Sequence, residues 1–161
     1  MNIDDANLVH DLLIGRRVLS LAVVDPSRHP VIGMVPFVAE IDLSSALVHV
    51  SRLAPHGKVM TNGTPYAALI QGSDDMTLQP GQIPRVRFNG RADLLERGTA
   101  AHTAGRESYL RRFPDSEVTF GLGDFDLYRL RFETGRLVAG FARTVNLKPE
   151  TLARLAVERA G

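Results

Sequence analysis

Apolar and polar residues alternate along one stretch of the chain, a pattern typical of a half-buried β-strand, and short apolar runs mark the other predicted strands. The alternating stretch runs from Arg85 to Arg91, where every second residue is arginine or asparagine and Val86 and Phe88 point to the opposite face. Other short apolar runs end at turn residues. They predict strands at 18–24, 30–41, 46–50, 66–70, 125–132 and 137–141.

Helical spacing of apolar residues is found mainly outside these runs. It predicts an N-terminal helix at about 4–14, with Asp4 and Asp5 at its cap, and short helices at 55–61 and 99–112. Pro149 opens a closing helix at about 149–159. The helices do not alternate regularly with the strands, so we expect a mainly β protein with peripheral α-helices, an antiparallel six- or seven-stranded barrel.

Turn residues predict how neighbouring strands are joined. Asp25-Pro-Ser-Arg28 separates the first two strands, which predicts a hairpin between 18–24 and 30–41. Glu133-Thr-Gly-Arg136 separates the last two, which predicts a final hairpin between 125–132 and 137–141.

Composition narrows the class of protein. The 161 residues, 44% apolar and 23% charged, are typical of a single globular domain spanning 1–161. No apolar run approaches the roughly 20 residues of a membrane helix, and the acidic start, Met1 to Asp5, is unlike a signal peptide. We therefore expect a cytoplasmic protein without a membrane partner. A net charge of +1 gives no reason to expect nucleic acid as a partner.

Residues for direct acid–base or metal chemistry are not evident. The chain has no cysteine, its five histidines lack metal-ligand spacing, and no carboxylate pair suggests a general acid and base. No catalytic residue and no metal ligand is assigned. Any catalysis is therefore expected to depend on a cofactor.

One polar cluster follows the strand at 46–50 and has the composition of an anion site. It consists of Ser51, Arg52, His56 and Lys58, near a helix start at Pro55. A hydroxyl, two cations, a ring nitrogen and the free N–H groups of a helix start suit a phosphate monoester. The alternative is a solvated loop. The basic face of 85–91 has the same two interpretations: a solvated outer face, or the lining of an anionic ligand or a subunit interface.

Several strings, taken in order, resemble a known family. They are Gly33-Met-Val-Pro-Phe-Val-Ala39, Ser51-Arg-Leu-Ala-Pro-His56, Pro84-Arg-Val-Arg-Phe-Asn-Gly-Arg-Ala92, Ser108-Tyr-Leu-Arg-Arg-Phe-Pro114, Gly123-Asp-Phe-Asp-Leu-Tyr-Arg-Leu130 and Gly140-Phe141. Over about residues 15–145 the chain resembles the haem-utilisation branch of the pyridoxamine 5′-phosphate oxidase-like superfamily. The resemblance implies an FMN-binding split β-barrel that forms a homodimer, with the flavin at the subunit interface.

The resemblance also implies positions for the cofactor-binding residues. The flavin ring would lie on the backbone of Met34, Val35, Pro36 and Phe37. The ribityl phosphate would meet Ser51, Arg52, His56 and Lys58. Arg85 matches a polar flavin contact on the fifth strand, and a dimer arm would include Phe141 and Arg143.

Departures from the family pattern restrict the function. Pyridoxamine phosphate oxidases carry an Arg-Lys pair where this chain has His56 and Gly57, and their C-terminal Arg/His motif is absent, so pyridoxamine phosphate is not the expected substrate. We expect an FMN-dependent oxidoreductase with a small-molecule redox substrate. The alternatives are a haem-binding or haem-degrading protein, with His49, His56 or His102 as candidate ligands, and a non-enzymatic flavin-binding module.

Overall fold

The computed structural model describes residues 1–140 and 142–160, and within them eight strands form one antiparallel sheet. The strands are β1 (Val18–Val24), β2 (Pro30–Ala39), β3 (Ser45–Ser51), β4 (Thr64–Gln71), β5 (Arg85–Leu94), β6 (Phe125–Arg131), β7 (Thr134–Val138) and β8 (Thr144–Leu147). Their order is β4-β1-β2-β3-β6-β5-β7-β8, and β4 also pairs with β5. This pairing closes six strands into a barrel, from which β7 and β8 extend.

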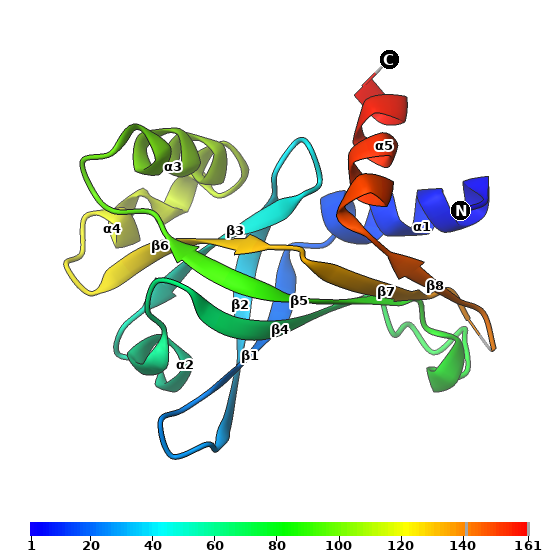
Figure 1. Cartoon of the computed structure of the whole chain (residues 1–161), viewed down its shortest axis with the longest axis horizontal. Coiled ribbons are helices and arrows are strands. Elements are labelled where there is room, and N and C mark those ends of the chain that lie inside the picture. Colours follow the sequence, from blue (N-terminus) through cyan, green and yellow to red (C-terminus); the bar gives the residue numbers. More distant parts are fainter. Residues whose placement is uncertain (141, 161) are drawn as a thin grey trace.

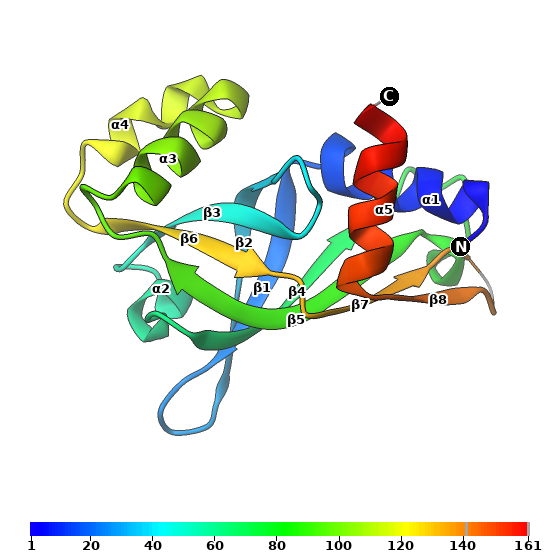
Figure 2. The same ribbon diagram turned by 45° about the horizontal axis from the view of Figure 1, so that its top comes forward.

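Helices surround the barrel at its two ends (Figures 1 and 2). The helical segments are α1 (Ile3–His10), η1 (Asp11–Gly15), α2 (Pro55–Val59), η2 (Pro80–Gln82), α3 (Ala100–Arg112), η3 (Pro114–Ser116), α4 (Glu117–Phe120) and α5 (Pro149–Ala160). Helices α1 and α5 lie next to each other at one end, and α3 with α4 lie at the other. No helix of the described segments is long and apolar enough to cross a membrane.

Two apolar clusters hold the fold together. The first fills the barrel with inward-facing side chains from all six strands, among them Phe37, Val48 and Phe88, and extends to Leu152 and Leu155 of α5. The second lies outside the barrel, where α3 and α4 cover the outer face of β3 and β6. At Gly105 of α3 an added Cβ would lie 2.9 Å from Leu95 Cδ1, so the absent side chain allows the helix to approach the sheet closely. This second layer explains why β3 is buried on both faces.

The barrel is split between β2 and β3. Strand β2 pairs with β1 along residues 30–36, but it pairs with β3 only through Phe37, Val38 and Ala39. The first half of β2 therefore has a strand on one side only.

The fold class predicted from the sequence is confirmed, as are the first hairpin and the alternation of β5. The predicted final hairpin is wrong: β6 pairs with β3 and β5, whereas β7 pairs with β5 and with β8, a strand that the sequence did not predict. The cap of α1 is Asn2, whose Oδ1 accepts the Asp5 N–H at 2.8 Å, and not Asp4 or Asp5. The helix also ends at His10 and continues as the π-turn η1.

Candidate functional site

The unpaired half of β2 exposes main-chain hydrogen-bonding groups. Phe37 donates its N–H to the carbonyl of Arg17, just before β1, at 3.0 Å. Successive residues of an antiparallel strand direct these groups to opposite sides, so those of Ile32 and Met34 point away from β1. Tyr109 Oη, 3.5 Å from the carbonyl oxygen of Pro36, agrees with this alternation. Ile32 and Met34 thus leave N–H and C=O groups on an open edge, and no hydrogen bond from another described residue reaches them.

The four residues predicted to bear the flavin ring divide between two faces of β2. Val35 and Phe37 are buried, with 4% and 0% exposure, and their side chains belong to the barrel core. Met34 is 71% exposed and Pro36 is exposed on the outer face. Met34 therefore combines a free backbone with an accessible side chain.

Helix α2 packs tightly against the ends of β2 and β3. A Cβ on Gly57 would lie 1.9 Å from the Ser51 carbonyl oxygen, and a Cβ on Gly33 would lie 2.3 Å from His56 Nδ1. Both positions exclude a side chain. The contact at Gly57 leaves no room for a side chain at the position directly after His56.

Ser51 and Arg52 are bound to carboxylates that precede and begin β6. Ser51 Oγ donates to Asp124 Oδ2 at 3.0 Å, and Arg52 Nη1 donates to both oxygens of Asp126 at 2.9 and 3.0 Å. Arg52 also donates through Nη2 to the carbonyl of Gly123. The positive charge of Arg52 is therefore neutralised within the chain.

His56 and Lys58 point to different surroundings. His56 is 9% exposed, and desolvation by burial lowers the pKa of its ring, so the imidazole is neutral at pH 7. Lys58 is exposed to solvent. The structure thus brings Ser51 and Arg52 together with Asp124 and Asp126, while the His56 ring turns toward the inner face of β2.

Sequence reasoning missed the two aspartates. Their signal is the string Gly123-Asp-Phe-Asp126, which places an acid at every second position just where β6 begins. Because they lie more than 70 residues from Ser51 and Arg52, spacing along the chain gave no reason to join them.

Arg85 lies on the outer face of the sheet beside a shallow hollow. Its Nη1 donates to the Ile83 carbonyl at 3.0 Å. The hollow, of about 240 Å³, is lined by Leu69, Arg85, Arg87, Arg136 and Val138. A second hollow of about 310 Å³ shares Leu69 and reaches Met34. Arg85 and Met34 thus both lie on the outer face of the sheet.

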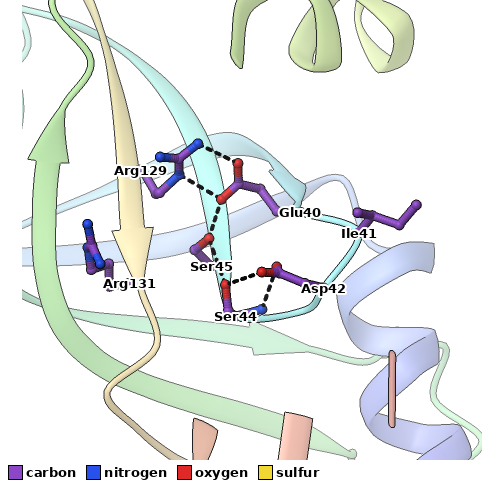
Figure 3. Close-up of a pocket in the computed structure, with 7 residues that line it drawn as sticks. All are labelled: Glu40, Ile41, Asp42, Ser44, Ser45, Arg129 and Arg131. Atoms are coloured by element: carbon purple, nitrogen blue, oxygen red, sulfur yellow. Dashed lines mark hydrogen bonds and ion pairs between the residues drawn. The ribbon is translucent and has the colours of Figure 1, made fainter. Parts of the chain in front are cut away.

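A larger pocket, of about 360 Å³, lies at the turn between β2 and β3 (Figure 3). There Arg129 Nε and Nη2 donate to the two carboxylate oxygens of Glu40 at 2.7 and 2.8 Å, and Ser45 donates its hydroxyl to the same group. The hydrogen bonds with Glu40 raise the pKa of Arg129. Because these polar groups bind one another, we interpret this pocket as a structural ion-pair network.

His49, one of the histidines considered as a haem ligand, is buried beneath α4. Its ring stacks on Phe120 with centroids 3.8 Å apart, and its Nδ1 lies 3.2 Å from Thr119 Oγ1. Burial, followed by the positive charges of Arg97 and His102, lowers the pKa of His49 to about 4. Within the described residues no three His, Asp or Glu side chains come together as a metal site.

The predicted dimer arm includes Phe141 and Arg143, and only Arg143 can be described. Phe141 lies outside the described residues. Arg143, in the turn before β8, forms an ion pair with Asp5 of α1, with Nη2 2.8 Å from Oδ1. Asp5 is 4% exposed. Arg143 therefore ties the β7–β8 turn to the N-terminal helix of its own chain.

The closed six-stranded barrel, split at β2 and extended by two strands, is also found in solved structures. A haem-binding protein from Mycobacterium smegmatis covers 96% of this chain at 20% identity with a TM-score of 0.82, and this chain spans 62% of its length. HutZ, the haem storage protein of Vibrio cholerae, has 26% identity and a TM-score of 0.66 over 78% of this chain and 87% of its own.

A Clostridium acetobutylicum protein of the pyridoxinephosphate oxidase family, related to general stress protein 26, shares the fold over 93% of this chain and 99% of its own. Its identity is 11% and its TM-score is 0.66. No protein-family model and no curated protein matches the chain. The comparisons therefore show that this chain shares its fold with haem-binding proteins and with a protein of the pyridoxinephosphate oxidase family, the two groups that its sequence strings resemble.

Proposed function

We propose that this protein is a homodimeric FMN-dependent oxidoreductase acting on a small-molecule redox substrate, with the flavin ring on the open edge of β2. The observation that supports the proposal is the unpaired backbone of Ile32 and Met34 beside the exposed Met34 side chain. A flavin ring has a polar edge that pairs with such groups and apolar faces that rest on such a side chain. When bound, the flavin supplies the hydride or electron transfer, and the chain binds and orients it.

The open edge of β2 fits the flavin ring better than the predicted anion site at the end of β3 fits the flavin phosphate. At the end of β3, a phosphate next to Ser51 and Arg52 would face the carboxylates of Asp124 and Asp126, and like charges at that distance repel. His56 is neutral and Arg52 is paired with Asp126, which leaves Lys58 as the cation of the predicted set without a carboxylate partner among the described residues. As these side chains are arranged, the set of Ser51, Arg52, His56 and Lys58 does not fit a dianion.

A second copy of the chain is part of the proposal. Strands β1 and β2 expose apolar side chains on their outer faces: Val18 by 43%, Val24 by 59%, Ile32 by 70% and Met34 by 71%. Pairing this surface with its symmetry mate would remove it from water. We also propose a cytoplasmic location, with which the absence of cysteine is compatible.

Haem is the alternative ligand. It is favoured by the likeness in fold to proteins named for haem binding and haem storage. Of the candidate iron ligands, His49 and His56 are 7% and 9% exposed. A haem iron would therefore need either a movement of α4 or α2, or the partly exposed His102 of α3 as its ligand. A flavin-binding module without enzymatic activity is the third candidate.

The test is optical titration of the purified full chain. With FMN we expect quenching of flavin fluorescence and a shift of the flavin bands, followed by bleaching with NADH or NADPH. A Soret shift with haem in place of any flavin response would favour the haem alternative. Flavin that binds but is not reduced would favour the non-enzymatic module, and no response to FMN would contradict the proposal. Sedimentation velocity of the same sample tests the dimer.

A further inference from the structure

Two arginines face each other across neighbouring strands on the outer face of the sheet. Arg87 of β5 pairs in register with Arg136 of β7, and Arg85 lies two residues along β5 on the same face. Directly opposed like charges in an antiparallel pair repel each other. A negative charge bound close by would relieve this repulsion.

No carboxylate of the described residues supplies that charge. Arg136 donates to Thr144 Oγ1 at 3.0 Å and to Asn146 Oδ1 at 3.4 Å, and Arg85 donates to main-chain carbonyls. Arg87 makes no hydrogen bond or ion pair with any described residue. Five other arginines do pair with carboxylates, namely Arg52, Arg106, Arg129, Arg131 and Arg143. These three arginines therefore form a local excess of positive charge in a chain whose total net charge is only +1.

The space beside the three arginines is hollow and partly apolar. They line the hollow of about 240 Å³ together with Leu69 and Val138. Leu69 also lines the hollow of about 310 Å³ that continues toward Val18 and Met34. The surface therefore offers a cationic end and an apolar body in one continuous direction.

The register places these two parts in one row. Met34 is paired with Ser20, Ser20 with Leu69, and Leu69 with Arg87. The row follows the curved wall of the barrel, and Leu69 in its middle lines both hollows. A ligand with an acidic group at one end and a conjugated ring at the other could follow this wall from the arginines across Leu69.

We propose that Arg87 and Arg136, with Arg85 beside them, bind the anionic group of a ligand whose flat apolar body extends over Leu69 toward Met34. The placement of the body rests on the proposed function, whereas the arginine site stands on its own contacts. The ligand class is a conjugated ring that carries two negative charges. Both the phosphate of FMN and the paired propionates of haem meet that description. The three arginines then hold the anionic group. The loop that contains Arg52 does not hold it, because the carboxylates of Asp124 and Asp126 already lie there.

The test compares charge-neutralising variants. Arg87→Gln and Arg136→Gln should each raise the Kd for FMN by about 10- to 100-fold, because each removes a charge-assisted hydrogen bond. Riboflavin, which lacks the phosphate, should bind wild type and variants within about twofold of each other. If haem is the ligand, the same loss should appear for haem and not for its dimethyl ester.

Arg91→Gln is the matched control. Arg91 lies on the same face of β5 and is exposed, but it donates to the Gly63 carbonyl at 3.0 Å and does not line the hollow. It should leave the Kd unchanged within about twofold. Arg52→Gln is the competing variant. If it weakens FMN more than Arg87→Gln does, the anionic group lies at the end of β3 and the proposal is overturned.

Failure of the proposed function can be told apart from failure of the anion site. Unchanged FMN affinity in Arg87→Gln and Arg136→Gln would overturn the anion site and leave the flavin proposal intact. If wild type binds neither FMN nor haem, pyrophosphate serves as the probe. A rise in the melting temperature of wild type that is absent in Arg87→Gln would support the anion site, and no rise in wild type would overturn it.

Discussion

The imidazole of His56 occupies the space that a side chain at Gly33 would need. A Cβ on Gly33 would lie 2.3 Å from Nδ1 and 2.4 Å from Cε1 of that ring. Helix α2 is thereby seated against the inner face of β2 at the point where β2 has lost its pairing with β3. The contact fixes the position of the open edge to which the flavin ring is assigned.

We predict that Gly33→Ala lowers the free energy of unfolding by about 1–3 kcal/mol, since the added methyl group must displace the His56 ring or the strand. Urea denaturation of both proteins measures the difference. Gly15→Ala is the matched control, because a Cβ at Gly15 meets no atom within 4 Å. It should not destabilise the protein.

A double-mutant cycle tests the cause of that loss. If the clash with the ring is responsible, Gly33→Ala should cost much less in a His56→Ala background than in the wild type. Equal costs in both backgrounds would show that the backbone of Gly33, and not the His56 ring, sets the requirement for glycine.

The sequence predicted local structure best where side chains alternate cleanly. Val86 and Phe88 against Arg85 and Arg87 predicted β5 and its faces, and both were confirmed. The prediction of the last hairpin is wrong because glycine in the string Glu133-Thr-Gly-Arg136 is typical of a turn, whereas Gly135 has another role. It lies within β7, where a Cβ would be 2.7 Å from the Phe88 ring, so this glycine serves close packing. Glycine alone does not distinguish these two uses.

The candidate site was less predictable than the fold. Met34 and Arg85 are predicted from the sequence as cofactor-binding residues, and both lie on the outer face of the sheet beside hollows that share Leu69. Their role in binding stays a prediction. The sequence did not reveal that Asp126 would neutralise Arg52, because the partners come from strands that are distant in sequence and adjacent in the sheet. Charge balance of a site depends on such tertiary pairing, which residue spacing does not encode.

His49 should make stability depend on pH. Its pKa in the folded protein is about 4, below the usual 6.5, because burial disfavours the charged ring. Between these values the unfolded chain binds more protons than the folded one, so stability increases with pH across this window and is lost as the pH falls from 6.5 toward 4. We expect His49 to contribute a loss of about 2 kcal/mol over that range.

Urea denaturation at pH 7, 6, 5 and 4 measures this contribution when wild type is compared with His49→Phe. The variant should lose less stability over the interval, since it has no ring to protonate. His29→Gln is the control, because the His29 side chain is 78% exposed, and it should follow the wild-type curve. Parallel curves for wild type and His49→Phe would contradict the assignment.

The Glu40–Arg129 ion pair should contribute more to the free energy of unfolding than the neighbouring Asp93–Arg131 pair. Arg129→Met leaves the carboxylate of Glu40, 22% exposed, with the Ser45 hydrogen bond but without the two from Arg129, and we expect a loss of about 1–3 kcal/mol. Arg131→Met removes a pair whose arginine is 62% exposed, so a loss below about 1 kcal/mol is expected. Thermal or urea unfolding compares the two. Equal losses would mean that Glu40 is solvated well enough not to need Arg129.

The open edge of β2 can be tested with proline. The N–H of Met34 points away from β1. Pro30 and Pro36 lie an even number of residues from Met34 along β2, so β2 already carries two prolines at positions whose N–H groups the pairing with β1 does not use. Met34→Pro should therefore keep the β1–β2 pairing, with a stability change below about 1 kcal/mol. It removes the donor that we assign to the flavin ring, so the Kd for FMN should rise about tenfold.

Two further variants separate the backbone from the side chain. Met34→Leu keeps the N–H and an apolar side chain, so its affinity for FMN should stay within about threefold of wild type. Val35→Pro removes an N–H that the ladder uses toward β1, and it should destabilise the protein by about 3 kcal/mol or more. Fluorescence titration gives the affinities and urea denaturation the stabilities. If Met34→Pro folds and binds FMN as tightly as wild type, the ring does not use this N–H, and the flavin must be assigned to another part of the barrel.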